Sequence, residues 1–271
     1  MKYIHGENIE IFQDLAITIG KFDGLHKGHM ALIDKLKKVA NNHDLATAVL
    51  SFSPHPAAVL SGKNIPLILS QYEKISLLEQ EGIDYYIEFP FTHQFAQVLP
   101  ENFIEDIIFK QLQTRALVVG ENFRFGESGR GDVALAQEIG AKLGLHVHTL
   151  PLVADKNAQI SSETIRKMIN TKDFCGAKQA CGRDFFLMGD AVQSKKKGQQ
   201  MGFPAANIIT PKNKLLPPAG VYHTRTFVDD ISYESISNVN ANNVETRLQG
   251  YTGDLYGRYI RIDFLQSLDE K

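Results

Sequence analysis

Short apolar runs alternate with longer amphipathic stretches through about residue 165. The runs predict buried strands at residues 15–19, 46–52, 84–89, 116–119 and 146–150. Between them, apolar side chains recur at helical spacing and predict helices at residues 30–40, 74–81, 101–111 and 133–143. Strands that alternate with helices are typical of a parallel sheet covered on both faces, so we expect a doubly wound α/β domain. Ligands of such sheets bind beyond the carboxyl ends of the strands.

The pattern changes after residue 165. Residues 166–181 indicate helix and connector, and from about residue 184 the segments become short and β-rich, with Gly and Pro between them. These segments are residues 185–188, 220–222, 226–228 and 259–264. Closely spaced strands with turn signals predict a small β-barrel. We therefore expect two domains, residues 1–182 and residues 183–271, and we expect residues 195–197 to form a solvated turn.

Composition narrows the class of protein. The 271 residues are enough for about two domains, and 43% hydrophobic with 22% charged residues is ordinary for a soluble globular protein. The 29 Lys and Arg against 31 Asp and Glu give a net charge of −2, which argues against nucleic-acid binding. No signal peptide and no apolar run of ~18 residues is evident, so we expect a cytoplasmic protein with no membrane contact. Cys175 and Cys181 are too few for a zinc site or a disulfide framework.

The strongest chemical signal is segment 20–29, GKFDGLHKGH, which follows the first predicted strand and opens the first predicted helix. Its glycines let the backbone pass close to a bulky ligand, and a helix N-terminus attracts anions. His26 and His29 are three residues apart, so on a helical turn they point the same way. Two imidazoles beside a phosphate site can stabilise charge on a leaving pyrophosphate. The alternatives are a glycine turn with incidental histidines, or a metal pair that lacks a third ligand.

A second segment, Phe52-Ser53-Pro54-His55-Pro56, lies at the carboxyl end of the second predicted strand. Its two prolines would make a rigid rim and Phe52 offers an aromatic face, although any strand-ending turn could have this sequence. A third segment, residues 120–126, also follows a predicted strand.

Residues 120–126 carry polar and aromatic side chains between two glycines. Asn122 can make paired hydrogen bonds to the edge of a heterocycle, Phe123 and Phe125 can stack on it, and Arg124 can hold a phosphate. The alternative is a loop whose aromatics pack inward.

A fourth segment, residues 160–166, has the features of a helix start. Ser161 or Ser162 is suited to the N-cap, and Arg166 lies one turn along. Hydroxyls, free N–H groups and a guanidinium could together grip a triphosphate, while an ordinary capped helix remains the competing interpretation.

These four segments, in this order, resemble the bacterial bifunctional riboflavin kinase/FAD synthetase family, and the resemblance covers essentially the whole chain. Segment 20–29 is similar to the His-x-Gly-His nucleotidyltransferase motif, segment 52–56 to the family's Phe-x-Pro-His-Pro motif, and segment 120–126 to its flavin-site loop. Segment 160–166 matches Ile-Ser-Ser-Thr-x-Ile-Arg, except that Glu163 stands where Thr is usual. The resemblance implies an FMN adenylyltransferase that converts FMN and MgATP to FAD and pyrophosphate.

The resemblance also implies roles for the site residues. His26 and His29 would stabilise charge while the FMN phosphate attacks the α-phosphorus of ATP. The implied ATP-binding residues are Gly20, Phe22, Asp23, Gly28, Ser161, Ser162 and Arg166. The implied FMN-binding residues are Phe52, Pro54, His55, Pro56, Asn122, Phe123, Arg124 and Phe125. Magnesium would bridge the ATP phosphates rather than occupy a protein cage, so no protein metal site is expected.

The C-terminal part is similar to the family's riboflavin kinase barrel, with departures. Residues 202–208 resemble Gly-Phe-Pro-Thr-Ala-Asn-Ile, but Ala205 replaces the Thr whose hydroxyl helps to bind magnesium. Gln199 stands where Arg is common, and residues 238–243 replace a longer segment. Asn207 and Glu245, the latter aligned with the catalytic base, would form a kinase-like site.

We therefore expect mainly an FAD synthetase, with a weak or inactive kinase half; the alternative is a fully bifunctional enzyme. The expected partners are the small molecules ATP and FMN, with riboflavin if the kinase half is active, and the oligomeric state is left open. Another hypothesis is an enzyme of the same superfamily with a different acceptor, such as a pantetheine phosphate or a nicotinamide nucleotide. A non-catalytic flavin- or nucleotide-binding regulator would leave the two histidines unexplained.

Overall fold

The structure, a computed structural model, describes residues 1–7, 9–152, 154–155, 158–193, 205–240 and 243–269. The expectations for residues 195–197, 199, 202–204 and 241–242 lie outside the described residues. The chain divides into two compact units. The first comprises Met1–Ile65 and Lys74–Gln159, and the second comprises Pro66–Glu73 and Ile160–Lys271.

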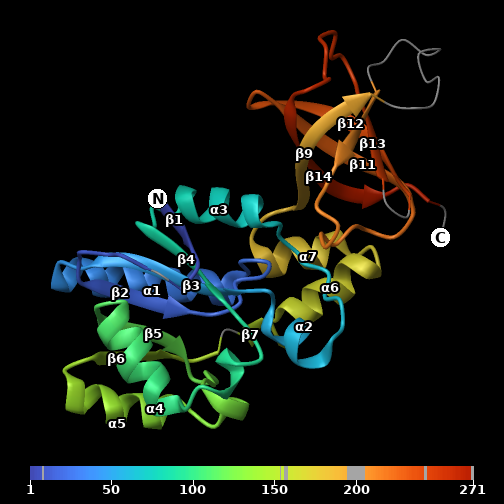
Figure 1. The fold of residues 1–271 in the computed structure, drawn as a ribbon. Helices are drawn as coiled ribbons and strands as arrows, with labels where there is room; N and C mark the ends of the chain where they lie inside the picture. Colours follow the sequence, from blue (N-terminus) through green and yellow to red (C-terminus); the bar gives the residue numbers. More distant parts are fainter. Residues whose placement is uncertain (8, 153, 156–157, 194–204, 241–242, 270–271) are drawn as a thin grey trace. The chain divides into compact units, whose positions relative to one another are not determined.

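The first unit is built on a six-stranded parallel sheet in the order β1-β4-β3-β2-β5-β6 (Figure 1). Its strands are β1 Lys2–His5, β2 Leu15–Ile19, β3 Ala46–Ser53, β4 Tyr85–Pro90, β5 Thr114–Gly120 and β6 His146–Leu150. All five predicted strands are confirmed, and β1 is an additional edge strand beside β4. Every residue of β2 is buried, as expected for a central strand of a parallel sheet covered on both faces.

Helices cover the sheet of the first unit. They are α1 Lys27–His43, α2 Pro56–Ser61, α3 Gln71–Gln80, η1 Phe95–Gln97, α4 Pro100–Asn102, η2 Phe103–Gln111, η3 Glu127–Gly129 and α5 Val133–Leu143. The helix expected at residues 101–111 is a short α-helical turn followed by a π-helix, η2. A small hairpin, β7 Ala154–Asp155 and β8 Ala158–Gln159, completes the unit. In the described part of the chain, no helix combines the length and apolar character needed to cross a membrane.

Local sequence explains where α5 begins and ends. The Asp132 carboxylate accepts a hydrogen bond from the Leu135 N–H at 3.0 Å and so caps the first turn. Gly144 ends the helix at φ 77°, a left-handed conformation that costs glycine little. The buried side chains of α5 and η2 share one core with Leu15, Ile17 and Ile19 of β2. Helix α1 packs against β2, β3 and β5.

The second unit is a closed antiparallel barrel preceded by two helices, α6 Ser162–Asn170 and α7 Phe174–Cys181. The barrel order is β10-β13-β12-β11-β14-β9. Its strands are β9 Phe185–Gln193, β10 Ala205–Ile209, β11 Gly220–Val228, β12 Ile231–Asn240, β13 Asn243–Leu248 and β14 Tyr259–Ser267. The predicted fold class, a doubly wound parallel sheet followed by a small β-barrel, is confirmed.

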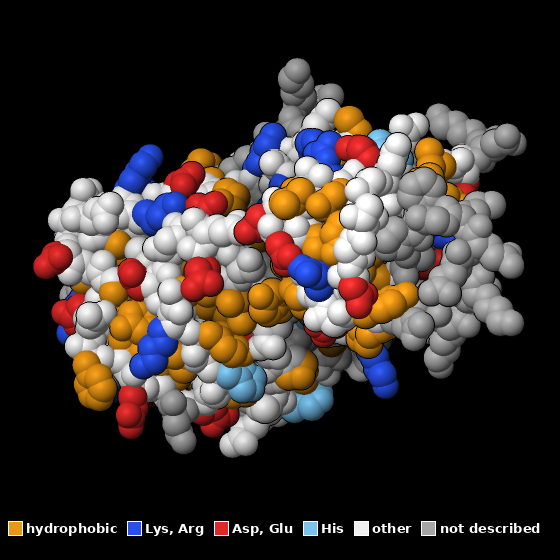
Figure 2. Space-filling view, turned by 90° about the horizontal axis from the view of Figure 1, so that it is seen from above, with side chains coloured by type: hydrophobic (Ala, Val, Ile, Leu, Met, Phe, Trp, Pro, Cys, Tyr) orange, Lys and Arg blue, Asp and Glu red, His pale blue; other side chains and the backbone are white. Residues whose placement is uncertain are grey.

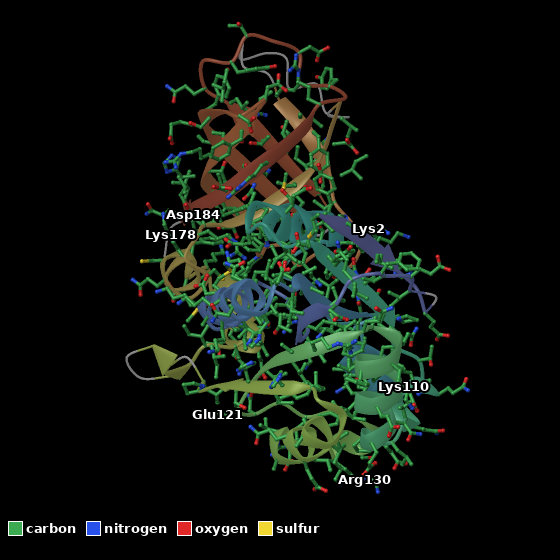
Figure 3. All side chains as sticks on the ribbon, turned by 90° about the vertical axis from the view of Figure 1, so that its left-hand side faces the viewer. Lys2, Lys110, Glu121, Arg130, Lys178 and Asp184 are labelled. Carbon is green, nitrogen blue, oxygen red and sulfur yellow. The ribbon has the colours of Figure 1, made fainter. Side chains whose placement is uncertain are left out.

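Helices α6 and α7 pack with the barrel. Ile165, Ile169 and Phe174 belong to the core that fills it, and the Phe174 ring lies 5.8 Å from that of Phe264 between centroids. Lys178 and Asp184, both labelled in Figure 3, form an ion pair at 3.1 Å that ties α7 to the chain just before β9.

One segment from the middle of the chain, residues 66–73, also belongs to the second unit. The Glu73 carboxylate lies 2.6 Å from the Lys214 ammonium, and neither side chain is exposed to solvent. Lys214 also donates to the carbonyls of Ile68 and Phe186. Because the pair is buried and hydrogen-bonded, loss of either partner would leave an uncompensated charge inside the unit.

Candidate active site

Three of the predicted segments follow neighbouring strands of the sheet. Segments 20–29, 52–56 and 120–126 lie after the carboxyl ends of β2, β3 and β5, which are adjacent in the order β3-β2-β5. Strands β3 and β4 are added on one side of β2, whereas β5 and β6 are added on the other. Parallel α/β sheets bind ligands where the strand order reverses in this way. The first unit therefore brings these three segments to one edge of the sheet, at its switch point.

The loop after β2 is tightly wound and buried. Phe22 and Leu25 have φ of 45° and 42°, a left-handed conformation that side chains other than glycine rarely adopt. Both side chains are buried, as is the Asp23 carboxylate. A Cβ atom on Gly20 would lie 3.1 Å from the Phe22 ring, so glycine lets this ring fold back over the backbone. The surrounding packing must hold this strained conformation in place.

His26 and His29 stack on each other. Their ring centroids are 3.8 Å apart with 28° between the planes, and the Phe22 ring lies 4.9 Å from that of His29. His26 occupies the N-cap of α1, but its side chain makes no capping hydrogen bond. The Nδ1 atoms of both rings are buried. The prediction that the two imidazoles point the same way is confirmed, and they do so at the N-terminal end of a 17-residue helix.

A set of buried polar groups that the sequence patterns did not predict contacts this loop. The Lys21 carbonyl accepts hydrogen bonds from Ser51 Oγ at 3.1 Å and from Lys74 Nζ at 3.4 Å. Burial lowers the pKa of Lys74, while the carboxylates of Asp23 and Glu88 act in the opposite direction. Nothing in the sequence marks Lys74 as buried, because lysine is almost always exposed.

Glu88 is the hydrogen-bonding centre of the same region. Its carboxylate accepts from Tyr3 Oη at 2.7 Å and from Tyr86 Oη at 3.2 Å, and His5 Nδ1 lies 3.6 Å away. Burial, followed by the charge of Glu88, raises the pKa of Tyr86 well above its ordinary value. Tyr86 therefore stays a neutral donor, and the edge strand β1 is fastened to β4 through Tyr3.

Segment 52–56 turns directly into helix α2. His55 is its N-cap, with Nδ1 accepting from the Ala57 N–H at 3.2 Å, and Pro56 is its first residue. Pro54 is exposed and Phe52 is half-buried. One ring nitrogen of His55 is thus used to cap the helix. Phe52 and Pro54 are the surfaces of this segment best suited to an aromatic ligand.

A chain of aromatic rings connects segment 52–56 with segment 120–126. Neighbouring rings have centroids between 5.0 and 6.2 Å apart, the range of favourable aromatic contacts. The chain runs through Phe52, Phe95, Phe103, Phe125 and Phe123, with Phe89 and Phe91 beside Phe95. The roles of Phe91, Phe95 and Phe103 were not predicted, because no local sequence pattern shows that residues 95 and 103 join two distant loops.

The loop after β5 divides its side chains between core and surface. Phe125 is buried, and its ring lies so close to Gly131 that a Cβ there would be 2.6 Å from it. Asn122 and Arg124 are exposed, and Arg124 donates to the neighbouring Phe123 carbonyl at 3.0 Å. Phe123 is half-buried. The exposed pair and Phe123 are open to a ligand, whereas Phe125 mainly supports the loop.

Ser161, Ser162 and Arg166 lie in the second unit, on helix α6. Ser161, rather than Ser162, is the N-cap, because its Oγ accepts from the Thr164 N–H at 3.1 Å. Arg166 donates to the Pro66 carbonyl at 2.9 Å. Glu163, which departs from the family motif, forms an exposed ion pair with Lys167 at 2.9 Å.

The two residues expected for the kinase-like site lie opposite each other. Asn207 of β10 and Glu245 of β13 are register partners on adjacent antiparallel strands, so their side chains share one face. Asn207 Oδ1 accepts from the Asn243 amide at 2.7 Å, and Glu245 lies 3.3 Å from the Arg247 guanidinium. The structure brings this predicted pair together.

The distribution of charged side chains and of possible metal ligands can be compared with the sequence-based expectations. On the face shown in Figure 2, Lys and Arg side chains are scattered among Asp and Glu rather than gathered into a basic stripe. Within the described ranges, no group of three or more His, Cys, Asp or Glu could hold a metal ion.

The parallel sheet with two stacked histidines at its switch point agrees with the nucleotidyltransferase class that the following family match shows. The FAD synthetase family model matches residues 8–164, and the riboflavin kinase family model matches residues 181–271. A bifunctional riboflavin kinase/FMN adenylyltransferase from Buchnera aphidicola subsp. Acyrthosiphon pisum is 32% identical over 276 residues, which cover 97% of this chain and 88% of the relative. Its namesake from Escherichia coli strain K12 is 29% identical over 256 residues, covering 91% and 82%. The chain belongs to the bifunctional riboflavin kinase/FMN adenylyltransferase family.

A solved structure supports the fold independently. The crystal structure of a Streptococcus pneumoniae protein, described as a macrolide-efflux protein, matches the whole chain and 92% of that protein with a TM-score of 0.87. Its sequence identity is 23%, so the likeness establishes the fold alone.

Proposed function

We propose that this chain transfers the adenylyl group of MgATP to FMN, giving FAD and pyrophosphate. The observation that carries the proposal is the stacked pair His26 and His29 at the N-terminus of α1, at the same sheet edge as segments 52–56 and 120–126. The enzymes named in the comparisons as FMN adenylyltransferases support it.

In the proposed reaction a phosphate oxygen of FMN attacks the α-phosphorus of ATP. The bond from that phosphorus to the bridging oxygen breaks, and pyrophosphate leaves with the bonding electrons. His26 and His29 stabilise the charge that moves onto the leaving group, helped by the partial positive charge at the start of α1. No covalent enzyme intermediate is needed, so catalysis consists of positioning and electrostatic stabilisation.

We propose that magnesium enters this site bound to the phosphates of ATP. Asp23 is 1% exposed and its carboxylate acts electrostatically on Lys74, so it is not presented to solvent as an open metal cage would require. Mg²⁺ commonly binds substrate phosphates and water with few protein ligands, and when bound it neutralises phosphate charge. The loop residues Gly20, Phe22 and Gly28 would then shape the space for ATP.

The ATP phosphates are also expected to meet the start of α6. Ser161 already caps this helix through its hydroxyl, so its contribution would be to present the first-turn N–H groups to the β- and γ-phosphates. Ser162 and Arg166 would add a hydroxyl and a guanidinium. On the flavin side, the proposed ring contacts are Phe52, Pro54 and Phe123.

The kinase half is the second candidate function. The relatives named bifunctional, together with the riboflavin kinase match over residues 181–271, favour phosphorylation of riboflavin by the barrel over an inactive kinase half. The pairing of Asn207 with Glu245 agrees with that. Ala205 argues against a fast kinase reaction, since a methyl group cannot bind magnesium. We propose a bifunctional enzyme whose slower step is the kinase reaction.

The functional division that we propose is residues 1–182 for adenylyl transfer and residues 183–271 for the kinase. ATP, FMN and riboflavin are the proposed partners. The cytoplasmic location expected from the sequence stays a prediction.

The test is to incubate purified protein with MgATP and either FMN or riboflavin, and to separate the flavins by chromatography. We expect FAD from FMN, and a slower appearance of FMN and then FAD from riboflavin. Absence of FAD from FMN would overturn the main proposal. Absence of FMN from riboflavin would leave adenylyl transfer as the sole activity.

A further inference from the structure

Lys74 is a buried lysine that the proposed chemistry does not use. It lies in α3 with 7% of its surface exposed, and its ammonium lies 5.7 Å from the centre of the Tyr86 ring. Removing an ammonium from water is costly unless the protein compensates it. Here the compensation comes from the hydrogen bond to the Lys21 carbonyl and from the nearby carboxylates of Asp23 and Glu88.

The Lys21 carbonyl has two donors, Lys74 Nζ and Ser51 Oγ. A carbonyl oxygen has two lone pairs, so both bonds can form together. Together they fix the plane of the peptide bond between Lys21 and Phe22. Because φ of Phe22 is the rotation between this plane and the next carbonyl, fixing the plane restricts that rotation.

Phe22 needs such a restraint. Its φ of 45° lies in the left-handed region, which a bulky side chain adopts only when its surroundings enforce it. In this conformation the ring folds over Gly20 and lies against the His29 imidazole, with centroids 4.9 Å apart. If the peptide before Phe22 could rotate, the ring would leave this place and His29 would lose an aromatic surface that helps to orient it.

We propose that Lys74 is a positioning residue for His29, acting through the Lys21 carbonyl and the left-handed conformation of Phe22. The catalytic part of this inference rests on the proposed adenylyl transfer. The scheme assigns Lys74 no contact with substrate; its ammonium acts on the Lys21 carbonyl.

The first experiment compares Lys74→Met with Lys37→Met. Lys37 is a matched control because its ammonium also donates to a backbone carbonyl, that of Glu81, and to the Glu81 carboxylate, both at 3.1 Å. We expect K74M to lower kcat for FAD formation about 10- to 100-fold, the range that misplacement of a catalytic group produces, with little change in KM for FMN. K37M should keep both parameters.

The second readout needs no turnover. In the ligand-free protein labelled with ¹⁵N-histidine, the imidazole signals of His29, assigned with His29→Gln, should shift in K74M and not in K37M. The signals of His43, at the far end of α1, should stay in place in both. A purely structural role of Lys74 would not single out His29.

If K74M does not fold, Ser51→Ala removes the other hydrogen bond to the Lys21 carbonyl. It should shift the His29 signals and lower kcat in the same direction, by less than K74M. If a folded K74M or S51A keeps wild-type kcat and unshifted His29 signals, the inference is overturned. If the wild type makes no FAD, the proposed function fails, whereas the histidine signals still decide whether Lys74 positions His29.

Discussion

The two candidate sites of this chain are built in different ways. In the first unit, the two histidines stack at the start of α1, directly after a loop in which Phe22 and Asp23 are buried, so the backbone and packing hold them. In the second unit, Asn207 and Glu245 face each other from two barrel strands. There the proposed kinase chemistry would depend on separate side chains rather than on one wound loop.

This difference explains why similarity of fold has different consequences for the two sites. The loop in the first unit needs the correct backbone conformation, so preserving the fold preserves most of the site. A kinase site that needs a magnesium ligand can lose it through a single methyl group at Ala205, while the strand that carries the methyl group stays in the barrel. The family match over residues 181–271 therefore establishes the kind of domain but not the rate at which it phosphorylates riboflavin.

The largest expected effect tests the core of the second unit. Phe174→Ala removes a buried ring that contacts Phe264, Tyr222 and Phe185. We expect it to lower the free energy of unfolding by about 3–5 kcal/mol, measured by denaturant unfolding followed by circular dichroism. Phe12→Ala, at a residue that is 88% exposed, is the matched control and should change stability by about 0.5 kcal/mol at most. Equal effects of the two variants would contradict the packing of α7 in the barrel core.

The next effect separates the two sites by activity. His29→Ala should lower kcat for FAD formation by about 10²- to 10³-fold, as expected when one group that stabilises transition-state charge is removed. Riboflavin phosphorylation should be unchanged, because Asn207 and Glu245 lie in the other unit. His43→Ala changes another histidine of α1 and should leave both rates as they are. A similar loss in H43A would mean that the helix, rather than the imidazole, had been disturbed.

Restoring the hydroxyl in the barrel should have a smaller effect. Ala205→Thr should raise the rate of riboflavin phosphorylation by roughly 10- to 100-fold, the scale on which groups that support a metal site act. FAD formation from FMN should not change. The double variant with Glu245→Gln should lose the gain, because Glu245 is the expected general base. If A205T leaves the kinase rate unchanged, the methyl group does not limit this site.

Sequence patterns predicted the first unit better than the barrel, for a physical reason. The strand at residues 15–19 and the helix at residues 133–143 match β2 and α5 to the residue, because one is a bounded apolar run and the other an apolar pattern of helical period. Strand β12 was missed. Its inward positions include Ser235 and Ser237, whereas Ile236 between them is 51% exposed, so the expected hydrophobic alternation is reversed.

The buried hydroxyls of β12 are stable because they satisfy one another. Ser235 and Ser237 hydrogen-bond with Thr224, Thr226 and Thr246 at 2.8–3.0 Å, all inside the barrel. No period in a single strand reveals such a network, because its partners come from β11 and β13. The same limit applies to the active site, where the motifs were found but the tertiary contacts of the loop were not.

The smallest expected effect concerns the helix that is proposed to hold the ATP phosphates. Ser161→Ala removes the N-cap of α6, which should cost about 1 kcal/mol of stability, whereas Ser161→Gly should cost only a few tenths. If Ser161 serves ATP by ordering the first turn of the helix, KM for ATP should rise in S161A and stay near the wild-type value in S161G. Both values come from initial rates of FAD formation at saturating FMN. An equal rise of KM in both variants would show instead that the hydroxyl itself contacts the triphosphate. Ser161 would then act as a separate side chain, as in the proposed barrel site, rather than through the backbone, as in the loop before His26 and His29.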